Sequence, residues 1–381
     1  MTYRETASPL RIAMIGTPFF EVPPSGYGGI ELICSVLVDA LIARGHRVTL
    51  FSAGPSTGTR ATFVSTRPEL QYQRLGQAVP ELMHAARTDR LLREAGRFDL
   101  VHDHSAAGPL VARARSLPTV VTMHADAGAD GEWGDFYADL GDAVQMVAIS
   151  RFQRRQRPDL HWLGTVYNAV NPDSFTPAHA PGGPVLWLAR FTPDKGPDLA
   201  IRACRQANLP LVLAGKCNEP AEQRYLDEVI RPMLGPDVRL VLNADRATTH
   251  RLLTEARCLI MPIRWHEPFG MVMAEAMASG TPVVGLRRGS VPEVVAHGVT
   301  GWVCDEPEEL PQALHRCAEL DAAACVTRVR EHFSADVMAR GYERLYRKAI
   351  AAQRARPGPG PALRRAGPDP WISPGRTGRV P

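Results

Sequence analysis

Two glutamates, Glu267 and Glu275, stand at a spacing that could present both carboxylates to one ligand. Glu267 follows an apolar run, residues 258–261, that is short enough for a buried strand, and Glu275 lies in a helix-forming stretch, residues 271–277. A helix start offers free N–H groups and the positive end of a dipole, which favours a phosphate. We therefore expect an anion near Gly270, with hydroxyl groups of the same ligand on the two carboxylates. The alternative is a helix carboxylate and an unrelated surface charge.

A pair of cations could meet the same anion. Arg190 and Lys195 follow a second short apolar run, residues 184–189, and precede a helix that begins at Pro197. The planar fork of a guanidinium and the point charge of an ammonium both bind diphosphates. We predict that these two side chains do so, and the alternative is two surface cations at a turn.

A glycine-rich loop after the first apolar run, residues 10–16, offers a second phosphate site. Gly28 and Gly29 stand where a helical pattern begins, and glycine lets the backbone approach a phosphate closely. The loop has neither the Gly-Lys-Ser/Thr ending of a P-loop nor the spacing Gly-x-Gly-x-x-Gly. The sequence therefore does not favour an NAD-dependent dehydrogenase. A tight turn without a ligand is the alternative.

Histidines stand at the ends of two further predicted strands. His102 and His104 follow residues 98–101, and His124 follows residues 119–122. Parallel sheets bind ligands beyond the carboxyl ends of their strands, so His104 is expected to contact a substrate or orient a loop. No third ligand accompanies the His-x-His pair at a suitable spacing, and we predict no metal site. For His124 the alternative is a strand-end histidine that a backbone carbonyl satisfies.

Strand-like and helix-like stretches alternate along the chain, which predicts an α/β fold with parallel sheets. A length of 381 residues suggests two domains. The Pro/Gly-rich stretch 173–183 is the best boundary, between an N-terminal domain over residues 1–172 and a C-terminal domain over residues 184–334. An amphipathic helix over residues 335–352 follows, and residues 353–381 are expected to form a disordered basic tail rich in proline and glycine.

Charge, cysteine content and hydrophobicity exclude several classes of function. The tail carries six arginines and one aspartate, which leaves 38 basic and 39 acidic residues elsewhere and no electrostatic case for nucleic-acid binding. The seven cysteines include no Cys-x-x-Cys pair, so we expect buried reduced thiols in a cytoplasmic protein. No signal peptide or transmembrane helix is predicted. A basic stretch at residues 150–157 leaves peripheral contact with a membrane surface open.

The motif Glu-Pro-Phe-Gly at 267–270, the alanine- and methionine-rich helix after it and the following Ser-Gly-Thr-Pro resemble the family 4 retaining glycosyltransferases, which use nucleotide sugars. The two glutamates match that family's Glu-x7-Glu pattern. Arg190 and Lys195 stand in a variant of its Gly-Arg…Glu-Lys-Gly motif, in which alanine replaces the first glycine and aspartate the glutamate. The resemblance extends over roughly residues 10–350. It implies the GT-B fold, in which two Rossmann-like parallel-sheet domains face each other across a cleft and the last helix crosses back to the first.

The resemblance also implies a role for most of these residues. The C-terminal domain would hold a nucleoside-diphosphate sugar as the donor, with Glu275 on its ribose. The residues implied at the donor diphosphate are Gly28, Gly29, Arg190, Lys195, Phe269, Gly270 and Met271. His124 and Glu267 would be catalytic residues near the reacting sugar, and His104 would contact the acceptor or orient its loop.

The implied reaction moves a sugar to an acceptor hydroxyl and retains its anomeric configuration. The chain has no Asp-x-Asp motif, so cations and the helix start would stabilise the departing diphosphate without a metal ion or another cofactor. A GT-B-fold nucleotide-sugar epimerase or phosphorylase and a non-catalytic sugar-nucleotide-binding protein remain as alternatives. The acceptor, the nucleotide base, the sugar and the oligomeric state stay open at this point.

Overall fold

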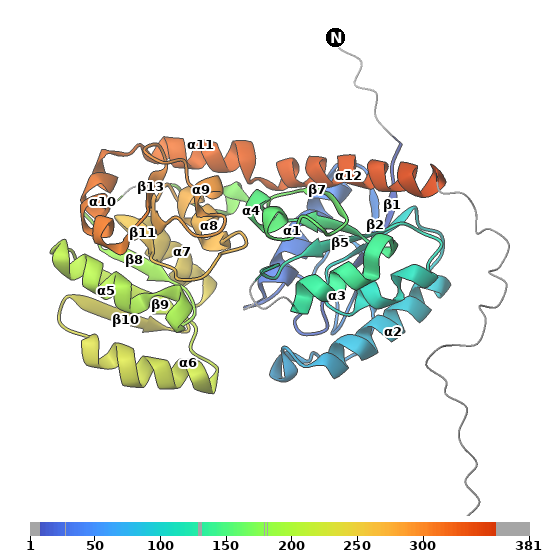
Figure 1. The fold of residues 1–381 in the computed structure, drawn as a ribbon, viewed down its shortest axis with the longest axis horizontal. Coiled ribbons are helices and arrows are strands. Elements are labelled where there is room, and N and C mark those ends of the chain that lie inside the picture. Colours follow the sequence, from blue (N-terminus) through green and yellow to red (C-terminus); the bar gives the residue numbers. More distant parts are fainter. Residues whose placement is uncertain (1–7, 27, 129–131, 179, 181, 356–381) are drawn as a thin grey trace, which may run out of the picture.

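The structure is a computed structural model that describes residues 8–26, 28–128, 132–178, 180 and 182–355. The chain forms two α/β domains side by side, and the last helix, red in Figure 1, lies along the first domain. Each domain is built on a parallel sheet. The predicted α/β class with two parallel-sheet domains is confirmed.

Within the described residues, the first sheet has seven parallel strands in the order β3-β2-β1-β4-β5-β6-β7. Helices cover both faces, because alternate residues of β1 pack under α1 on one side and against α2 on the other. The strands are β1 (Arg11–Ile15), β2 (Arg47–Ser52), β3 (Thr62–Ser65), β4 (Leu100–Asp103), β5 (Thr119–Met123), β6 (Gln145–Ala148) and β7 (Trp162–Thr165). The helices are α1 (Gly29–Ala43), α2 (Ala78–Glu94), α3 (Glu132–Leu140) and α4 (Arg151–Gln156).

The second sheet has six parallel strands among the described residues, in the order β10-β9-β8-β11-β12-β13. Its two faces are covered by two separate hydrophobic clusters, one with α7, α8 and α11 and one with α5 and α10. The strands are β8 (Val185–Leu188), β9 (Leu211–Gly215), β10 (Val238–Leu242), β11 (Cys258–Met261), β12 (Val283–Leu286) and β13 (Gly301–Cys304). The helices are α5 (Pro197–Gln206), α6 (Pro220–Tyr225), α7 (Arg246–Glu255), α8 (Met271–Ala278), α9 (Val291–Val294), α10 (Leu310–Arg316) and α11 (Ala322–His332).

The strand order reverses once in each sheet, between β1 and β4 in the first and between β8 and β11 in the second. In open parallel sheets a ligand crevice forms outside the carboxyl ends of the strands at such a reversal. The loops that follow these four strands carry Gly28, His104, Lys195 and Glu267. The topology therefore places the predicted site residues at the two positions where ligands are expected.

The last helix, α12 (Ala335–Ala355), returns the chain to the first sheet. The hydroxyl of Tyr342 lies 2.8 Å from Thr122 Oγ1 on β5, and the hydroxyl of Tyr346 lies 2.7 Å from His102 Nδ1 on β4. The predicted end of this helix at residue 352 is wrong by three residues. Alanine, glutamine and arginine at 353–355 are good helix formers, so the helix continues until the first prolines approach.

Four other predictions concern the chain as a whole. All seven cysteines are free and buried, as predicted. No helix in the described part of the chain is long and apolar enough to cross a membrane. The rest of the predicted tail, residues 356–381, lies outside the described residues, and the domain boundaries at 172 and 184 stay a prediction.

Candidate functional site

An ion pair marks the point where the second sheet reverses its strand order. Lys195 Nζ, in the loop after β8, lies 2.9 Å from Glu267 Oε2, in the loop after β11. The two side chains are only 15% and 13% exposed, and the ammonium also lies 3.9 Å from the centroid of the Trp265 ring. The ring and the carboxylate fix the ammonium and leave it with donors for an anion. The structure thus brings together Lys195, which is predicted to bind the diphosphate, and Glu267, which is predicted to be catalytic.

The turn that carries Lys195 is tied to the loop after β11. Arg264 donates two hydrogen bonds to the carboxylate of Asp198, at 2.7 and 2.8 Å, and one of 2.7 Å to the carbonyl oxygen of Pro193. Its backbone N–H donates to the carbonyl oxygen of Asp194 at 2.8 Å. A bidentate arginine–carboxylate pair is among the more rigid links between two loops. The position of Lys195 therefore depends on these bonds as well as on its own ion pair.

The loop that carries Glu267 is held by close backbone packing. Gly289 has a φ of 59°, and a Cβ at that position would come within 2.3 Å of the carbonyl oxygen of Glu267. The backbone N–H of Ser290 donates to that oxygen at 2.8 Å, and its hydroxyl donates to the carbonyl oxygen of the buried Phe269 at 2.9 Å. Gly270, with a φ of 75°, then turns the chain into α8. The free N–H groups of this helix start consequently lie directly after Glu267.

Helix α8 presents two more predicted residues. Met271 packs against hydrophobic clusters of both domains, which places the helix start at the domain junction. Glu275 lies in the second turn, and burial raises the pKa of its carboxyl group. In the part of the chain that the structure describes, no hydrogen bond or ion pair satisfies this carboxylate. Glu275 therefore has the capacity to accept hydrogen bonds from two hydroxyl groups of a ligand.

Arg190 lies apart from this ion pair. Its guanidinium lies 3.3 Å from a carboxylate oxygen of Glu222 and 3.4 Å from one of Glu219. The side chains of Arg190 and Glu219 are 42% and 56% exposed, so this contact is weak and can be exchanged for a ligand, whereas Glu222 is buried. The structure does not bring Arg190 and Lys195 into contact, and the predicted role of Arg190 at the diphosphate stays a prediction.

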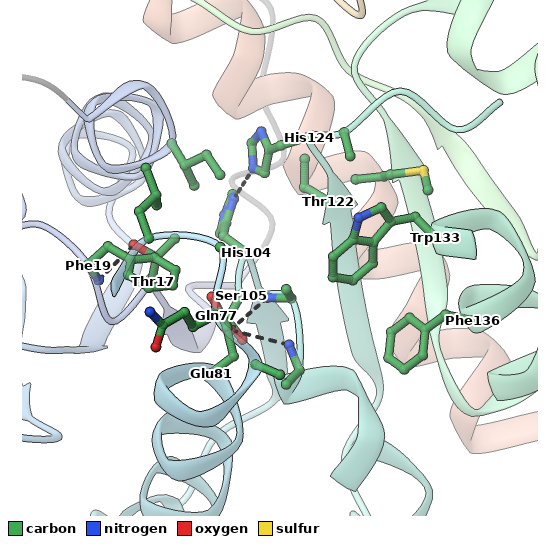
Figure 2. Close-up of a pocket in the computed structure, with 18 of the residues that line it drawn as sticks. Thr17, Phe19, Gln77, Glu81, His104, Ser105, Thr122, His124, Trp133 and Phe136 are labelled. Atoms are coloured by element: carbon green, nitrogen blue, oxygen red, sulfur yellow. Dashed lines mark hydrogen bonds between the residues drawn. The ribbon is translucent and has the colours of Figure 1, made fainter. Parts of the chain in front are cut away.

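A cavity of about 700 Å³ opens in the first domain beyond the ends of β4 and β5 (Figure 2). His104, His124 and Gly29 line it. Gly28 is the N-cap residue of α1, and nothing lies within 4 Å of the place where a Cβ of Gly29 would be. The start of α1 is therefore open at Gly29, whereas a Cβ at Gly28 would lie 3.0 Å from Glu31 Oε2 and from Pro24, and the predicted role of the two glycines stays a prediction.

Two buried histidines, His102 and His104, and the partly buried His124 form hydrogen bonds at the carboxyl ends of β4 and β5. His104 Nδ1 lies 2.9 Å from His124 Nε2, and His102 has Thr122 Oγ1 and the Tyr346 hydroxyl at 2.7 Å on its two nitrogens. Burial lowers the pKa of all three, that of His124 to about 4, so the rings are neutral at pH 7. The bond between His104 and His124 then contains one proton, which one ring donates and the other accepts.

The two histidines of the His-x-His pair differ in whether a ring nitrogen lacks a hydrogen-bond partner and could bind a substrate. Both ring nitrogens of His102 are used inside the protein. His104 Nε2 is buried without a hydrogen-bond partner, although its residue lines the cavity. Among the described residues, no group of three histidine, cysteine, aspartate or glutamate side chains could hold a metal ion. His104 is accordingly the member that a substrate hydroxyl could satisfy.

Two buried glutamates that the sequence analysis missed complete the cavity wall. Glu31, in the first turn of α1, accepts a hydrogen bond from the hydroxyl of Thr17, and burial raises the pKa of its carboxyl group. Glu81 accepts from the backbone N–H groups of Ala106 and Ala107 at 3.1 and 3.3 Å, and burial raises its pKa to about 7. A carboxylate next to the apolar stripe of α1 is the sequence signal that could have identified Glu31. No local pattern distinguishes Glu81.

A third missed residue, Glu293, joins the two domains. Its carboxylate accepts hydrogen bonds from the backbone N–H groups of Arg151 and Phe152 at 2.8 and 2.6 Å, and from the hydroxyl of Tyr167 at 2.8 Å. It therefore stabilises the start of α4 from the opposite domain. Its partners lie 126 to 142 residues away in sequence, so no motif could have shown the contact.

Comparison with known proteins decides the family. The profile of Glycosyl transferases group 1 matches residues 183–324, and that of Glycosyltransferase Family 4 matches residues 27–174. The D-inositol 3-phosphate glycosyltransferase of Kribbella flavida is 30% identical over 351 residues, which cover 76% of this chain and 82% of that protein. This chain belongs to the family 4 glycosyltransferases. The D-inositol 3-phosphate glycosyltransferase of Jonesia denitrificans is 28% identical over 391 residues, or 85% of this chain and 90% of that enzyme.

Solved structures agree with this glycosyltransferase in fold. Sucrose-phosphate synthase from Thermosynechococcus elongatus superposes with a TM-score of 0.74 at 20% identity, over 90% of this chain and all of that one. The Anabaena protein HepE, solved in complex with UDP and glucose, gives a TM-score of 0.69 at 17% identity, over 89% of this chain and all of that one. The predicted GT-B fold is confirmed.

Proposed function

We propose that this glycosyltransferase moves a sugar from a nucleoside-diphosphate sugar to an acceptor hydroxyl, with retention of configuration and without a metal ion. The observation that carries the proposal is the ion pair of Lys195 and Glu267 directly before the start of α8. An ammonium, a carboxylate and free N–H groups on two neighbouring loops suit a diphosphate that is joined to a sugar. The complex of HepE with UDP and glucose supports the same chemistry in this fold.

The donor would lie along the loops of the second domain. Lys195 and the N–H groups at the start of α8 bind the diphosphate, and Arg190 joins them by exchanging its contact with the exposed Glu219 for phosphate oxygens. The unpaired carboxylate of Glu275 accepts hydrogen bonds from the two ribose hydroxyls. Gly28 and Gly29 approach the diphosphate from the first domain at the start of α1, which is open at Gly29.

In the reaction the bond between the anomeric carbon and the diphosphate oxygen breaks, the acceptor oxygen forms a bond to the same carbon, and the proton of the acceptor hydroxyl passes to the departing diphosphate. Negative charge grows on the diphosphate, where Lys195 stabilises it. Glu267 accepts hydrogen bonds from the sugar and offsets the positive charge that develops on its ring. We assign this carboxylate, which is paired with Lys195, an electrostatic role and no covalent one. Attack from the face that the diphosphate leaves then accounts for retention.

The first domain would supply the acceptor side. His124 is neutral at pH 7, so it can accept or donate a hydrogen bond to a sugar hydroxyl without adding charge. The cavity next to it receives the acceptor, and closure of the two domains would exclude water that otherwise hydrolyses the donor. We also propose that the protein acts in the cytoplasm, since its seven buried thiols are free.

A thermal-shift panel of UDP-, GDP-, dTDP- and ADP-sugars tests the donor assignment. A ligand that binds the native state raises its melting temperature, so at least one nucleotide sugar should do so in wild type and lose most of this effect in Glu275→Gln. Glu255→Gln is the matched control, because Glu255 lies on α7 with its side chain 51% exposed. If no nucleotide sugar shifts the wild type, or if both variants respond alike, the donor site is misplaced. The anomeric configuration of the product, measured by NMR, tests retention.

A further inference from the structure

We infer that the acceptor is a soluble molecule with a bulky, ring-rich apolar body, seated in the first-domain cavity with its reacting hydroxyl toward His104. The inference rests on the proposed function, which places the acceptor on this side of the enzyme. It goes further because it names the chemistry of the acceptor, which follows from the side chains that line the cavity.

Aromatic side chains make two opposite sides of the cavity. Figure 2 shows Trp133 and Phe136 on one side and Phe19 on the other. The rings of Trp133 and Phe136 lie 5.8 Å apart in an edge-to-face arrangement, and Trp133 is 40% exposed. Flat apolar ring systems pack well between such faces. A volume of about 700 Å³ is large enough for several fused rings and is wider than a single acyl chain requires.

Large aliphatic side chains continue this surface to the mouth of the cavity. Leu75, Leu82 and Leu110 all line it and are each about half exposed. A cluster of exposed apolar side chains at one hollow is uncommon on a soluble protein and marks a binding surface. These residues would cover the part of an acceptor that projects from the cavity.

The described wall of the cavity offers no cationic side chain to an anionic acceptor. None of the described residues that line the cavity is a lysine or an arginine, while Glu31, Glu81 and Glu132 are carboxylic acids. Recognition of a phosphate needs cationic side chains or a set of free N–H groups. The N–H groups at the start of α1 are assigned to the donor diphosphate, so a phosphate on the acceptor would find no cationic side chain on the described wall. An inositol phosphate, the acceptor that the names of the two relatives state, therefore does not match this cavity.

The position of the acceptor's reacting hydroxyl follows from His104 Nε2, which is buried without a hydrogen-bond partner. His104 is 3% exposed, lines the cavity and leaves Nε2 unsatisfied, which costs free energy until a ligand supplies a hydrogen bond. A hydroxyl can do so whichever way the proton between His104 and His124 points, because it can donate or accept. The open start of α1 at Gly29 lines the same cavity, so this hydroxyl would lie on the side where the diphosphate is expected.

Binding of acceptor probes in the absence of donor tests the inference directly. The panel contains a flavonol, a hydroxyanthraquinone and a steroid alcohol as ring-rich alcohols, and inositol 3-phosphate and glucose as polar ones, with affinity measured by calorimetry. At least one ring-rich alcohol should bind and become a substrate. Leu82→Asp should weaken its binding at least tenfold. Val79→Asp should change it less than twofold, since Val79 lies on the same helix with a similar exposure, 52% against 48%, but does not line the cavity.

Three results would overturn the inference: binding of inositol 3-phosphate alone, no binding by any ring-rich alcohol, or an equal effect of the two aspartate variants. Sedimentation with phosphatidylcholine vesicles separates a soluble acceptor from a membrane-borne one. Vesicle binding that both variants abolish would show that the apolar rim contacts lipid, and it would contradict a soluble acceptor. Donor binding is measured separately in the thermal-shift panel, so a bound nucleotide sugar with no ring-rich acceptor contradicts this inference and leaves the proposed function standing.

Discussion

The buried carboxyl group of Glu81 gives a quantitative prediction about stability. Burial raises its pKa to about 7 from an ordinary value of 4.5. Between these two pH values the folded chain binds a proton that the unfolded chain releases, so the free energy of unfolding falls as pH rises through this window. At about 1.4 kcal/mol per pKa unit the loss amounts to about 3 kcal/mol by pH 8. Below pH 4.5 the contribution of Glu81 is fully present.

Glu81→Gln removes this titration and keeps an oxygen that can accept from the N–H groups of Ala106 and Ala107. We expect equal melting temperatures for wild type and variant near pH 4.5, and a variant more stable by roughly 6 to 12 °C at pH 8. Calorimetry at several pH values measures the difference in melting temperature between wild type and variant. The effects of the other titrating groups cancel in this difference, because both proteins contain them. Glu94→Gln is the control, because Glu94 lies on the same helix with its side chain 60% exposed. Parallel curves for wild type and Glu81→Gln would refute the reasoning.

Four further predictions concern catalysis. Lys195→Ala should weaken donor binding and lower kcat/KM at least about 100-fold, or about 3 kcal/mol, and kinetics near wild type would remove the diphosphate assignment. Glu275→Gln should mainly raise the donor KM, because ribose contacts are equal in ground and transition states, whereas Glu267→Gln should mainly lower kcat; the reverse pattern would exchange the two roles. His124→Ala should reduce kcat with little change in donor binding. Because the ring of His124 is neutral, the activity of the wild type should not change with pH near 6.5. A change of activity there that His124→Ala removes would contradict the pKa of about 4. Activity should survive excess EDTA, and complete loss with rescue by Mn²⁺ or Mg²⁺ would contradict a metal-independent reaction.

The sheets could be predicted from the sequence wherever a strand is a buried apolar run. Continuous apolar runs mark β1, β8 and β11 in the sequence, because helices cover both faces of these strands. The edge strand β3 is only partly buried, and the run Gly301–Cys304 of β13 is too short to distinguish from a turn. Alternation of strand and helix was sufficient for the parallel topology, while the order of the strands needed the structure.

The start of α8 was predictable because its signals are local. Gly270 ends a loop in a left-handed conformation, and a stretch of good helix formers follows it directly. The pairing of Lys195 with Glu267 was not predictable from spacing, since 72 residues separate them. It follows from the neighbouring positions of β8 and β11 in the sheet.

The histidines show the same limit. Their positions at strand ends were visible in the sequence, but the pattern does not distinguish His102 from His104. Only the return of α12 gives His102 a partner on each nitrogen, with Tyr346 on one of them. The apolar cavity itself is assembled from loops and helices far apart in sequence, so its chemistry could not be predicted from any single stretch.

The most direct test of the central claim follows both products of one reaction. With the donor found by thermal shift and an acceptor found by calorimetry, release of the nucleoside diphosphate and formation of the glycosylated acceptor are measured together. We predict equal amounts of the two products in wild type, with or without EDTA, and a parallel loss of both in Glu267→Gln. Consumption of the nucleotide sugar without any glycosylated acceptor would contradict sugar transfer and would favour an epimerase or a hydrolase.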